Sequence, residues 1–252
     1  MHRLRFTTIV AAPLTVAFDV ARALGRPWPV PLEEVESVRP VRDVYTLGRG
    51  RRTLTHTRRF TATAEGTRVD EQVDWDTGLA GPLGALADRV VLRRRRVRRA
   101  MRRHLDGYAA AAAQQALDVV QVVGAAIVRG DHVLVAQRGS GPLAGLWEFP
   151  GGKVEPGEEH LAALVRECAE ELGITVSPQV LLGEVVLDGV VGGGVPGAST
   201  LRVWSARLAE GEPVAHEHRD LRWVGAADLD AMDWIAADRP LLPAVRELLG
   251  RP

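Results

Sequence analysis

Three glutamates share one face of a predicted helix in the segment GGKVEPGEEHLAALVRECAEELGI, residues 151–174. Glu167, Glu170 and Glu171 stand at positions i, i+3 and i+4. Like charges at this spacing repel one another and cost about 0.2–0.5 kcal/mol per pair. Clustered carboxylate oxygens are also the ligands that Mg²⁺ and Mn²⁺ prefer. The segment therefore predicts either a solvated helix face or a site where a bound cation offsets the repulsion.

The residues around these glutamates occur at a highly specific spacing. They run glycine, five residues, glutamate, seven residues, arginine-glutamate, two residues, glutamate-glutamate, one residue, glycine and an apolar residue: Gly152, Glu158, Arg166, Glu167, Glu170, Glu171, Gly173 and Ile174. This pattern resembles the complete Nudix box, GX5EX7REUXEEXGU, where U is a bulky apolar residue. One U position holds Cys168, whose buried thiol would act as a small hydrophobe. The resemblance covers about residues 118–250 and implies a Nudix α/β/α sandwich. In the same half, the sequence predicts a hairpin that turns at Gly130-Asp131 and a helix C-cap at Gly173.

Membership of this family would give most of these residues a role. In Nudix hydrolases, divalent metal ions at this helix bridge a diphosphate while water attacks one phosphorus atom. Mg²⁺ or Mn²⁺ would offset charge on the diphosphate and lower the pKa of a water molecule. The implied metal ligands are the Gly151 carbonyl, Glu167, Glu170 and Glu171, with Glu158 supporting them. Arg166 would orient a glutamate, and Lys153, the only lysine in the chain, would neutralise phosphate charge.

Residues outside the box indicate a substrate class. The run LWEFPGGKVEPGE and the tail EHRDLRWVGAADLDAMDWIAADRPLL resemble the MutT-like branch, which hydrolyses nucleoside triphosphates. That branch implies that Glu217, six residues before Trp223, completes the metal site and takes part in catalysis. It also implies that Asp238 reads the nucleobase edge, although Asp238 equally suits an ordinary helix N-cap. Phe149 would either line the base pocket or belong to the core.

We therefore predict an Mg²⁺-dependent pyrophosphohydrolase that converts a nucleoside triphosphate to a monophosphate and pyrophosphate. An oxidised nucleotide such as 8-oxo-dGTP is the first candidate substrate, and CTP or 5-methyl-dCTP is the alternative. Two other classes stay open: a ligand sensor without turnover, and a hydrophobic-ligand-binding protein with an auxiliary Nudix domain. The intact set of glutamates argues against lost chemistry.

Charge divides the chain into two halves. Residues 1–117 carry 21 basic and 12 acidic side chains, whereas residues 118–252 carry 11 basic and 20 acidic ones. A shift of this size indicates a domain boundary. We expect an α+β protein with an N-terminal domain over residues 1–112, a linker over 113–117 and the Nudix domain over 118–252.

The N-terminal half reads as a strand, a helix, three alternating strands and a long helix. Its opening AAPLTVAFDVA and its end DWDTGLAGPLGALADRVVLRR resemble the START-like (SRPBCC, polyketide cyclase) superfamily over about residues 3–112. That resemblance implies a helix-grip fold, in which a curved antiparallel sheet wraps a long helix around a cavity for a hydrophobic small molecule. We expect His56 and His104 to be surface or capping residues.

The remaining features favour a cytoplasmic protein without polymer or membrane partners. The arginine-rich run VVLRRRRVRRAMRRHLDGY suits an amphipathic helix with a solvated face, and no aromatic platform for nucleic acid accompanies it. No apolar run reaches the roughly 18–20 residues that cross a bilayer. The N-terminus has a basic end and apolar residues, as signal peptides do, but FTTIV also fits a first strand. The lone Cys168 excludes an intramolecular disulfide and suits a reducing compartment.

Overall fold

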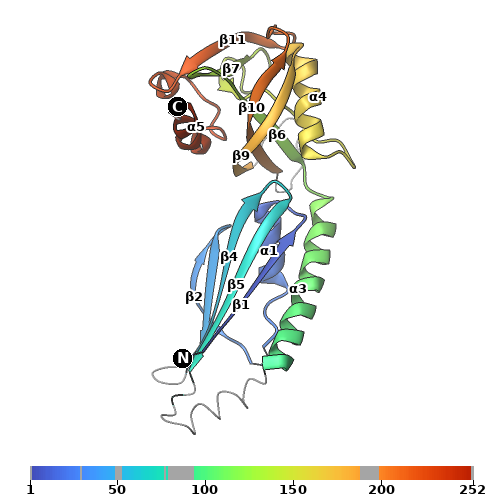
Figure 1. The fold of residues 1–252 in the computed structure, drawn as a ribbon, viewed down its shortest axis with the longest axis vertical. Helices are drawn as coiled ribbons and strands as arrows, with labels where there is room; N and C mark the ends of the chain where they lie inside the picture. The colour runs from blue at the N-terminus through green and yellow to red at the C-terminus, as the bar shows by residue number, and fades with distance from the viewer. Residues whose placement is uncertain are drawn as a thin grey trace. The chain divides into compact units, whose positions relative to one another are not determined.

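The computed structural model describes residues 2–28, 30–48, 53–76, 78, 94–187 and 199–250. The chain forms two compact units, residues 1–116 and 117–252. No helix in the described ranges is long and apolar enough to cross a membrane. Each unit has its own sheet (Figure 1).

The first unit is built on an antiparallel sheet that contains five strands within the described residues, in the order β1-β5-β4-β3-β2. Helices α1 and α3 pack against each other and against this sheet (Figure 1). The elements are β1 (His2–Val10), α1 (Leu14–Ala23), β2 (Glu33–Val38), β3 (Arg42–Leu47), β4 (Thr53–Thr63), β5 (Gly66–Asp76) and α3 (Arg94–Ala116).

The apolar stripe expected on the long helix is partly confirmed. Met101, Leu105 and Tyr108 are buried in α3, and the Tyr108 hydroxyl donates a 2.9 Å hydrogen bond to the Ala17 carbonyl of α1. The beginning of the expected helix, residues 81–93, lies outside the described residues. Residues 113–116, expected in the linker, continue α3 because alanine has the highest helix propensity. The helix-grip fold itself stays a prediction.

Two features of the first unit differ from the sequence analysis. The sequence does not predict strand β2, because its segment EEVESV carries three glutamates. It lies at the edge of the sheet, where charged side chains remain in water and discourage pairing with another chain. The expectation that His56 is a surface residue is wrong: its side chain is fully buried, 3.1 Å from Glu71, because the alternation of β4 turns it inward.

The second unit has three layers around a mixed sheet of six strands within the described residues, in the order β11-β7-β6-β10-β9 with β8 paired to β7. Strand β10 runs parallel to β6, and the other pairs are antiparallel. The elements are β6 (Gln121–Arg129), β7 (His132–Arg138), β8 (Trp147–Glu148), α4 (His160–Leu172), β9 (Thr175–Leu187), β10 (Ser199–Glu210), β11 (His218–Gly225), the 3₁₀ turns Leu229–Ala231 and Arg239–Leu241, and α5 (Leu242–Leu249).

Strand β6 shows how one sheet supports a core on each face. Val123, Ala125 and Ile127 belong to the core beneath α4. Ala126 belongs to the opposite core, which contains α5. Successive side chains of a strand point to opposite faces, so the apolar run of β6 covers both. The predicted hairpin with its turn at Gly130-Asp131 and the predicted α/β/α layering are both confirmed.

A buried ion pair fastens α1 to the sheet of the first unit. Arg58 in β4 donates to both carboxylate oxygens of Asp43 in β3, at 3.0 and 2.6 Å. The Arg58 Nη1 atom also donates to the Ala21 carbonyl of α1 at 2.7 Å. Both charged side chains are fully buried, so each depends on the other to offset its lost hydration.

We therefore expect Asp43→Asn to destabilise the first unit by about 3–5 kcal/mol, because it leaves the Arg58 charge buried and unpaired. Asp19→Asn is the matched control, since its partner Arg39 and Asp19 itself are both exposed and such pairs contribute less than about 1 kcal/mol. Amide hydrogen exchange of β3 to β5 in the full chain measures both changes. Equal protection in the two variants would contradict a structural role for the buried pair.

Candidate active site

Backbone hydrogen bonds fasten the loop before α4 onto strand β6. The Ala125 N–H donates to the Pro150 carbonyl at 2.8 Å, and the Val123 N–H donates to the Gly152 carbonyl at 2.9 Å. A Cβ atom on Gly152 would lie 2.4 Å from the carboxyl carbon of Glu167. A Cβ atom on Gly151, whose φ is 147°, would lie 2.1 Å from the Val123 carbonyl oxygen of β6, so glycine is required at position 151, whereas a side chain at position 152 would displace the Glu167 carboxylate.

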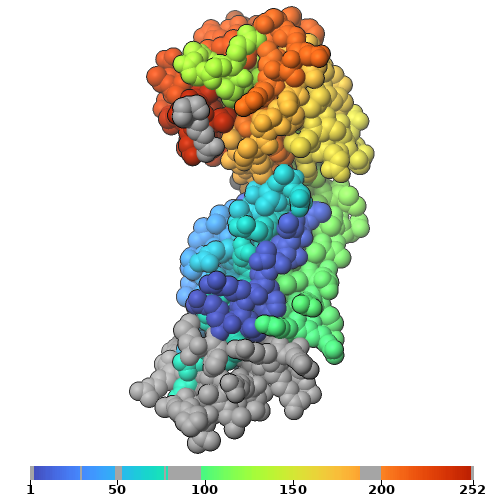
Figure 2. Space-filling view, viewed as in Figure 1, coloured from blue at the N-terminus to red at the C-terminus, as the bar shows by residue number. Residues whose placement is uncertain are grey.

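Helix α4 presents its glutamates because its opposite face is anchored in the core. Leu164, Cys168 and Leu172 are fully buried, which confirms Cys168 as a core residue. The helix ends at Gly173, whose left-handed φ of 66° and N–H bond to the Ala169 carbonyl form the predicted C-cap. The residues of α4 and the loop before it (yellow) form one side of the second unit in Figure 2.

Arg166 gathers three of the predicted carboxylates. Its Nε and Nη2 atoms donate to the two oxygens of Glu158 at 2.9 and 3.0 Å. Its Nη1 atom donates to Glu167 and to Glu170, each at 3.0 Å. The hydrogen bonds that Arg166 donates to Glu158 lower the pKa of Glu158 to about 2 and raise the pKa of Arg166. The predicted orienting role of Arg166 therefore has a geometric basis.

Glu171 lies in a different environment from its neighbours. One of its oxygens accepts a 3.0 Å hydrogen bond from the Gly151 N–H, so the helix and the loop meet at this carboxylate. Burial raises the pKa of Glu171 to about 7, although the nearby His218 acts in the opposite direction. Burial also raises the pKa of Glu167. Additional positive charge at this position would stabilise both carboxylates in their ionised form.

The sequence analysis missed a group of three residues beside Glu171. Arg138 Nη1 lies 2.8 Å from one Glu148 oxygen, and His218 Nε2 lies 3.5 Å from the other. Burial opposes charge on His218, but Glu148 and Glu171 outweigh it and raise its pKa. These residues come from β7, β8 and β11, which pair side by side. Their spacing in the sequence carries no signal, because only strand pairing brings them together.

The carboxylates fit a divalent cation by donor type, because hard oxygen ligands suit Mg²⁺. Arg166 already acts as a cation shared among Glu158, Glu167 and Glu170. Within the part of the chain that the structure describes, no three His, Cys, Asp or Glu side chains are gathered into a closed metal cage. The acidic face is thus arranged around a guanidinium, and assignment of individual metal ligands stays a prediction.

The other predicted site residues differ in their exposure to solvent. Lys153 is exposed, and its carbonyl accepts a 3.0 Å hydrogen bond from Arg166. Glu217 is also exposed, next to His216, whose N–H donates to the Glu171 carbonyl at the end of α4. Phe149 is a core residue, 5% exposed and 5.0 Å from the Trp234 ring centre.

Asp238 is buried and makes no side-chain cap. It precedes the 3₁₀ turn Arg239–Leu241, but its carboxyl group forms no capping hydrogen bond there. One of its oxygens instead accepts a 3.4 Å hydrogen bond from the Phe149 N–H. Burial, reinforced by the charge of Glu148, raises the pKa of Asp238 to about 8. A group in this state is largely protonated at neutral pH and donates as well as accepts.

Comparison with known proteins identifies the family. A model of the NUDIX domain matches residues 119–245, half of the chain. The chain belongs to the Nudix family. The predicted family is confirmed, and the second unit is a Nudix hydrolase domain.

Three relatives illustrate the range of similar enzymes. The chain is 52% identical over 119 residues to the putative 8-oxo-dGTP diphosphatase 2 of Mycobacterium tuberculosis, covering 47% of this chain and 82% of the relative. It is 39% identical over 135 residues to the CTP pyrophosphohydrolase of Escherichia coli, covering 52% and 95%. It is 34% identical over 107 residues to the 8-oxo-dGTP diphosphatase of Escherichia coli, covering 42% and 78%.

The raised pKa of Asp238 predicts a pH-dependent stability. A carboxyl group that titrates near 4 when unfolded and near 8 when folded stabilises the fold fully below pH 4. This contribution is lost as the pH rises towards 8. Asp238→Asn should therefore flatten the fall in the free energy of unfolding of the second unit between pH 5 and pH 8. Urea unfolding of both proteins across that range measures the effect, and parallel pH profiles would show that Asp238 is ionised in the folded state.

Proposed function

We propose that this Nudix hydrolase converts a nucleoside triphosphate and water to a nucleoside monophosphate and pyrophosphate, with Mg²⁺ or Mn²⁺ as cofactor. An oxidised purine nucleotide such as 8-oxo-dGTP is the leading substrate. The observation that carries the proposal is the acidic site at α4, where Arg166 and the Gly151 N–H hold three glutamates of the helix and Glu158 of the loop before it.

The proposed chemistry assigns distinct tasks to these residues. Glu167, Glu170 and Glu171 would hold the cation, together with the Gly151 carbonyl and Glu217. When bound, the cation would offset the negative charge that develops on the diphosphate. Arg166 keeps Glu158 ionised and in place through a bidentate hydrogen-bonded contact.

Two basic residues near this face would also take part: Lys153 would contact the phosphates, and His218 would hold a proton. Lys153 is the exposed cation in the loop, and we propose that it neutralises phosphate charge. His218 would carry a proton on Nε2, the atom that faces Glu148. Positioning and charge stabilisation of this kind supply most of the acceleration in phosphoryl transfer.

Asp238 is proposed to read the nucleobase. Its burial, its raised pKa and the absence of a side-chain cap favour this role over a purely capping one. A protonated carboxyl group presents one donor and one acceptor, which matches the mixed edge of an oxidised guanine. Phe149 would contribute indirectly, since its N–H orients the carboxyl group while its ring packs in the core.

CTP or 5-methyl-dCTP is the second candidate. The relative from Escherichia coli that is named a CTP pyrophosphohydrolase is matched over 95% of its length. Cytosine offers an exocyclic amine as a donor, and either form of the Asp238 carboxyl group accepts from it. The oxidised purine therefore requires the protonated form of Asp238, whereas the cytosine nucleotide is compatible with either form.

For the first unit we retain the START-like assignment and its hydrophobic ligand as a proposal. Its support is the antiparallel sheet with a long helix packed against it. We also propose a cytoplasmic location, which agrees with the single buried cysteine.

Glu171→Gln should reduce kcat at least about a hundredfold, because it keeps the shape of the side chain but removes a charge from the metal site, worth several kcal/mol. Glu212→Gln is the control, since that glutamate is 78% exposed and pairs only with Arg129 among its described contacts. Pyrophosphate release from 8-oxo-dGTP, with and without Mg²⁺, is the measurement. Turnover by the Glu171→Gln variant close to normal at saturating Mg²⁺ would disprove the assignment.

Asp238→Ala should change which nucleotide is preferred more than it changes the phosphate chemistry. Loss of the hydrogen-bonding partner leaves base groups unpaired, so kcat/KM for the preferred triphosphate should fall by roughly 1–3 kcal/mol. Poor substrates should change much less. Assays with 8-oxo-dGTP, dGTP, CTP and 5-methyl-dCTP test this. If all four rates fall by the same factor, Asp238 acts through stability alone.

A further inference from the structure

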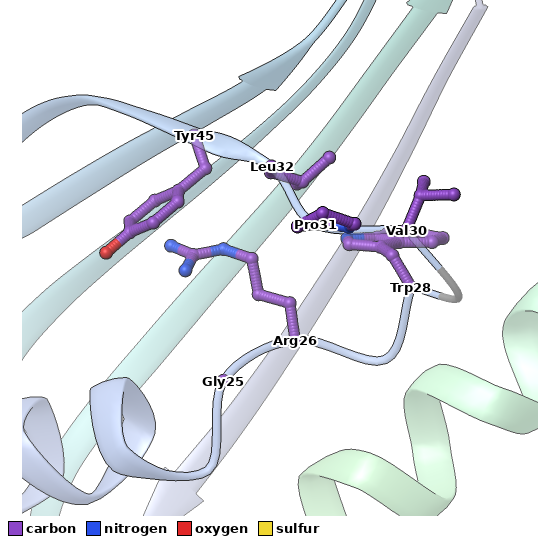
Figure 3. A pocket seen from close by; sticks show the side chains of 7 residues that line it. All are labelled: Gly25, Arg26, Trp28, Val30, Pro31, Leu32 and Tyr45. Atoms are coloured by element: carbon purple, nitrogen blue, oxygen red, sulfur yellow. The ribbon is translucent and has the colours of Figure 1, made fainter.

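The first unit contains a small pocket that the Nudix chemistry does not use. Its volume is about 290 Å³, close to the lower end of the roughly 300–1,000 Å³ typical of small-molecule sites. The segment that follows α1 and strand β3 supply its lining (Figure 3). Arg26 provides the charge in this lining, whereas Trp28, Pro31 and Leu32 provide apolar surface.

Arg26 has a buried donor that no other group in the described structure satisfies. Its side chain is 8% exposed, and its Nη2 atom donates to Asp43 at 2.8 Å. The centre of its guanidinium group lies 3.3 Å from the centre of the Tyr45 ring. The Nε atom is buried and has no hydrogen-bond partner within the described residues. The hydrogen-bonding capacity of this guanidinium group is therefore not fully used by the described residues.

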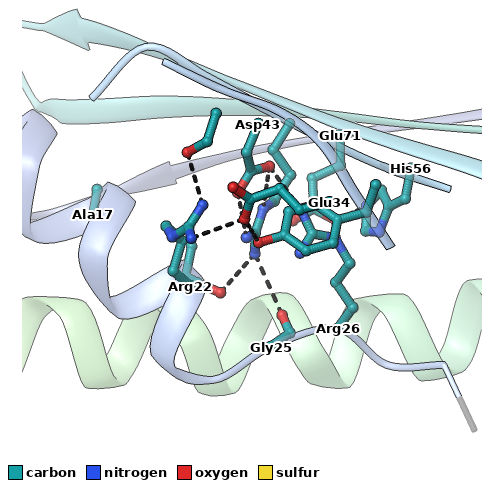
Figure 4. A network of polar contacts seen from close by, with 12 residues as sticks. Ala17, Arg22, Gly25, Arg26, Glu34, Asp43, His56 and Glu71 are labelled. Atoms are coloured by element: carbon teal, nitrogen blue, oxygen red, sulfur yellow. Dashed lines mark hydrogen bonds and ion pairs between the residues drawn. The ribbon is translucent and has the colours of Figure 1, made fainter. Parts of the chain in front are cut away.

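The surrounding charges leave Arg26 short of an anion. Asp43 (Figure 4) is shared, because Arg58 occupies both of its oxygens at 3.0 and 2.6 Å. Glu34 is engaged by Arg22 at 2.8 Å and by the Tyr45 hydroxyl. Burial, and then repulsion from Arg58, lower the pKa of Arg26. An added anion would relieve this strain on the charged form of Arg26.

Hydrogen bonds outside the pocket orient Trp28, which forms part of its apolar wall. The Trp28 indole N–H donates to His56 Nδ1 at 3.0 Å. An indole nitrogen only donates, so His56 carries its proton on Nε2 and donates to Glu71 at 3.1 Å. This chain of hydrogen bonds orients the indole ring and satisfies its polar atom, which leaves the ring available for apolar contact.

We propose that this pocket binds a small monocarboxylic acid with a flat apolar body. The carboxylate pairs with the guanidinium group of Arg26, and the body lies against Trp28 and Leu32. A single negative charge fits better than a phosphate dianion, because the Asp43 carboxylate already lies 2.8 Å from the same guanidinium group and would repel a second charge.

Isothermal titration of the full chain tests the proposal with benzoate and indole-3-acetate as probes. Their neutral amides, benzamide and indole-3-acetamide, are matched controls for shape, and inorganic phosphate tests the alternative anion. At least one acid should bind tenfold or more tightly than its amide. Failure of both acids to bind, equal binding of acid and amide, or tighter binding of phosphate would each overturn the proposal.

Two substitutions locate the binding. Arg26→Lys keeps the charge but removes the planar guanidinium group, and Leu32→Trp fills the apolar part while Arg26 remains. Each should weaken binding of the acid at least tenfold, whereas Arg68→Lys, at an exposed arginine paired with Asp70, should leave it unchanged. Circular dichroism checks folding, and Leu32→Trp decides the matter if Arg26→Lys does not fold. Unchanged affinity in the folded pocket variants would place the acid elsewhere.

Discussion

The contact between Arg166 and three glutamates is the interaction on which the active face of this enzyme depends. Four carboxylates in a short segment repel one another, and two of them, Glu167 and Glu171, are also partly removed from water. Arg166 offsets the repulsion for Glu158, Glu167 and Glu170, while the Gly151 N–H holds Glu171. The acidic face is therefore ordered by the protein's own donors.

That arrangement requires both the core beneath α4 and the loop beside it. Leu164 and Leu172 fix the rotation of the helix, which determines where Arg166 and the glutamates point. The hydrogen bonds between the loop and β6 fix the position of the loop, and a Cβ atom on Gly151 would lie 2.1 Å from the Val123 carbonyl oxygen of β6. A fixed rotation and a fixed loop together explain why glycines and glutamates must occur at one spacing in the Nudix box.

The first unit also depends on contacts between arginine and carboxylate groups, but here they hold secondary-structure elements together. Arg58 and Asp43 form a buried pair that joins two strands, and Arg58 also reaches the end of α1. In this case the carboxylate is the shared group, since Arg26 also contacts Asp43. The two units thus differ in the sign of the excess charge. In the Nudix domain one guanidinium group contacts several carboxylates, whereas in the first unit two guanidinium groups contact one carboxylate.

The sequence by itself determined the Nudix box, the hairpin around Gly130-Asp131 and the cap at Gly173. These features follow from local periodicity, spacing and backbone preference. It did not reveal the edge strand β2, whose composition is that of a loop, or the helical continuation through residues 113–116.

Only the tertiary structure decided which charged groups share a site. Arg138, Glu148 and His218 are distant in the chain and meet through the pairing of β7, β8 and β11. Burial, which no local pattern measures, gives Asp238 its raised pKa and leaves Arg26 with an unsatisfied donor. Hydration and charge balance depend on everything packed around a group, so they are settled only when the chain has folded.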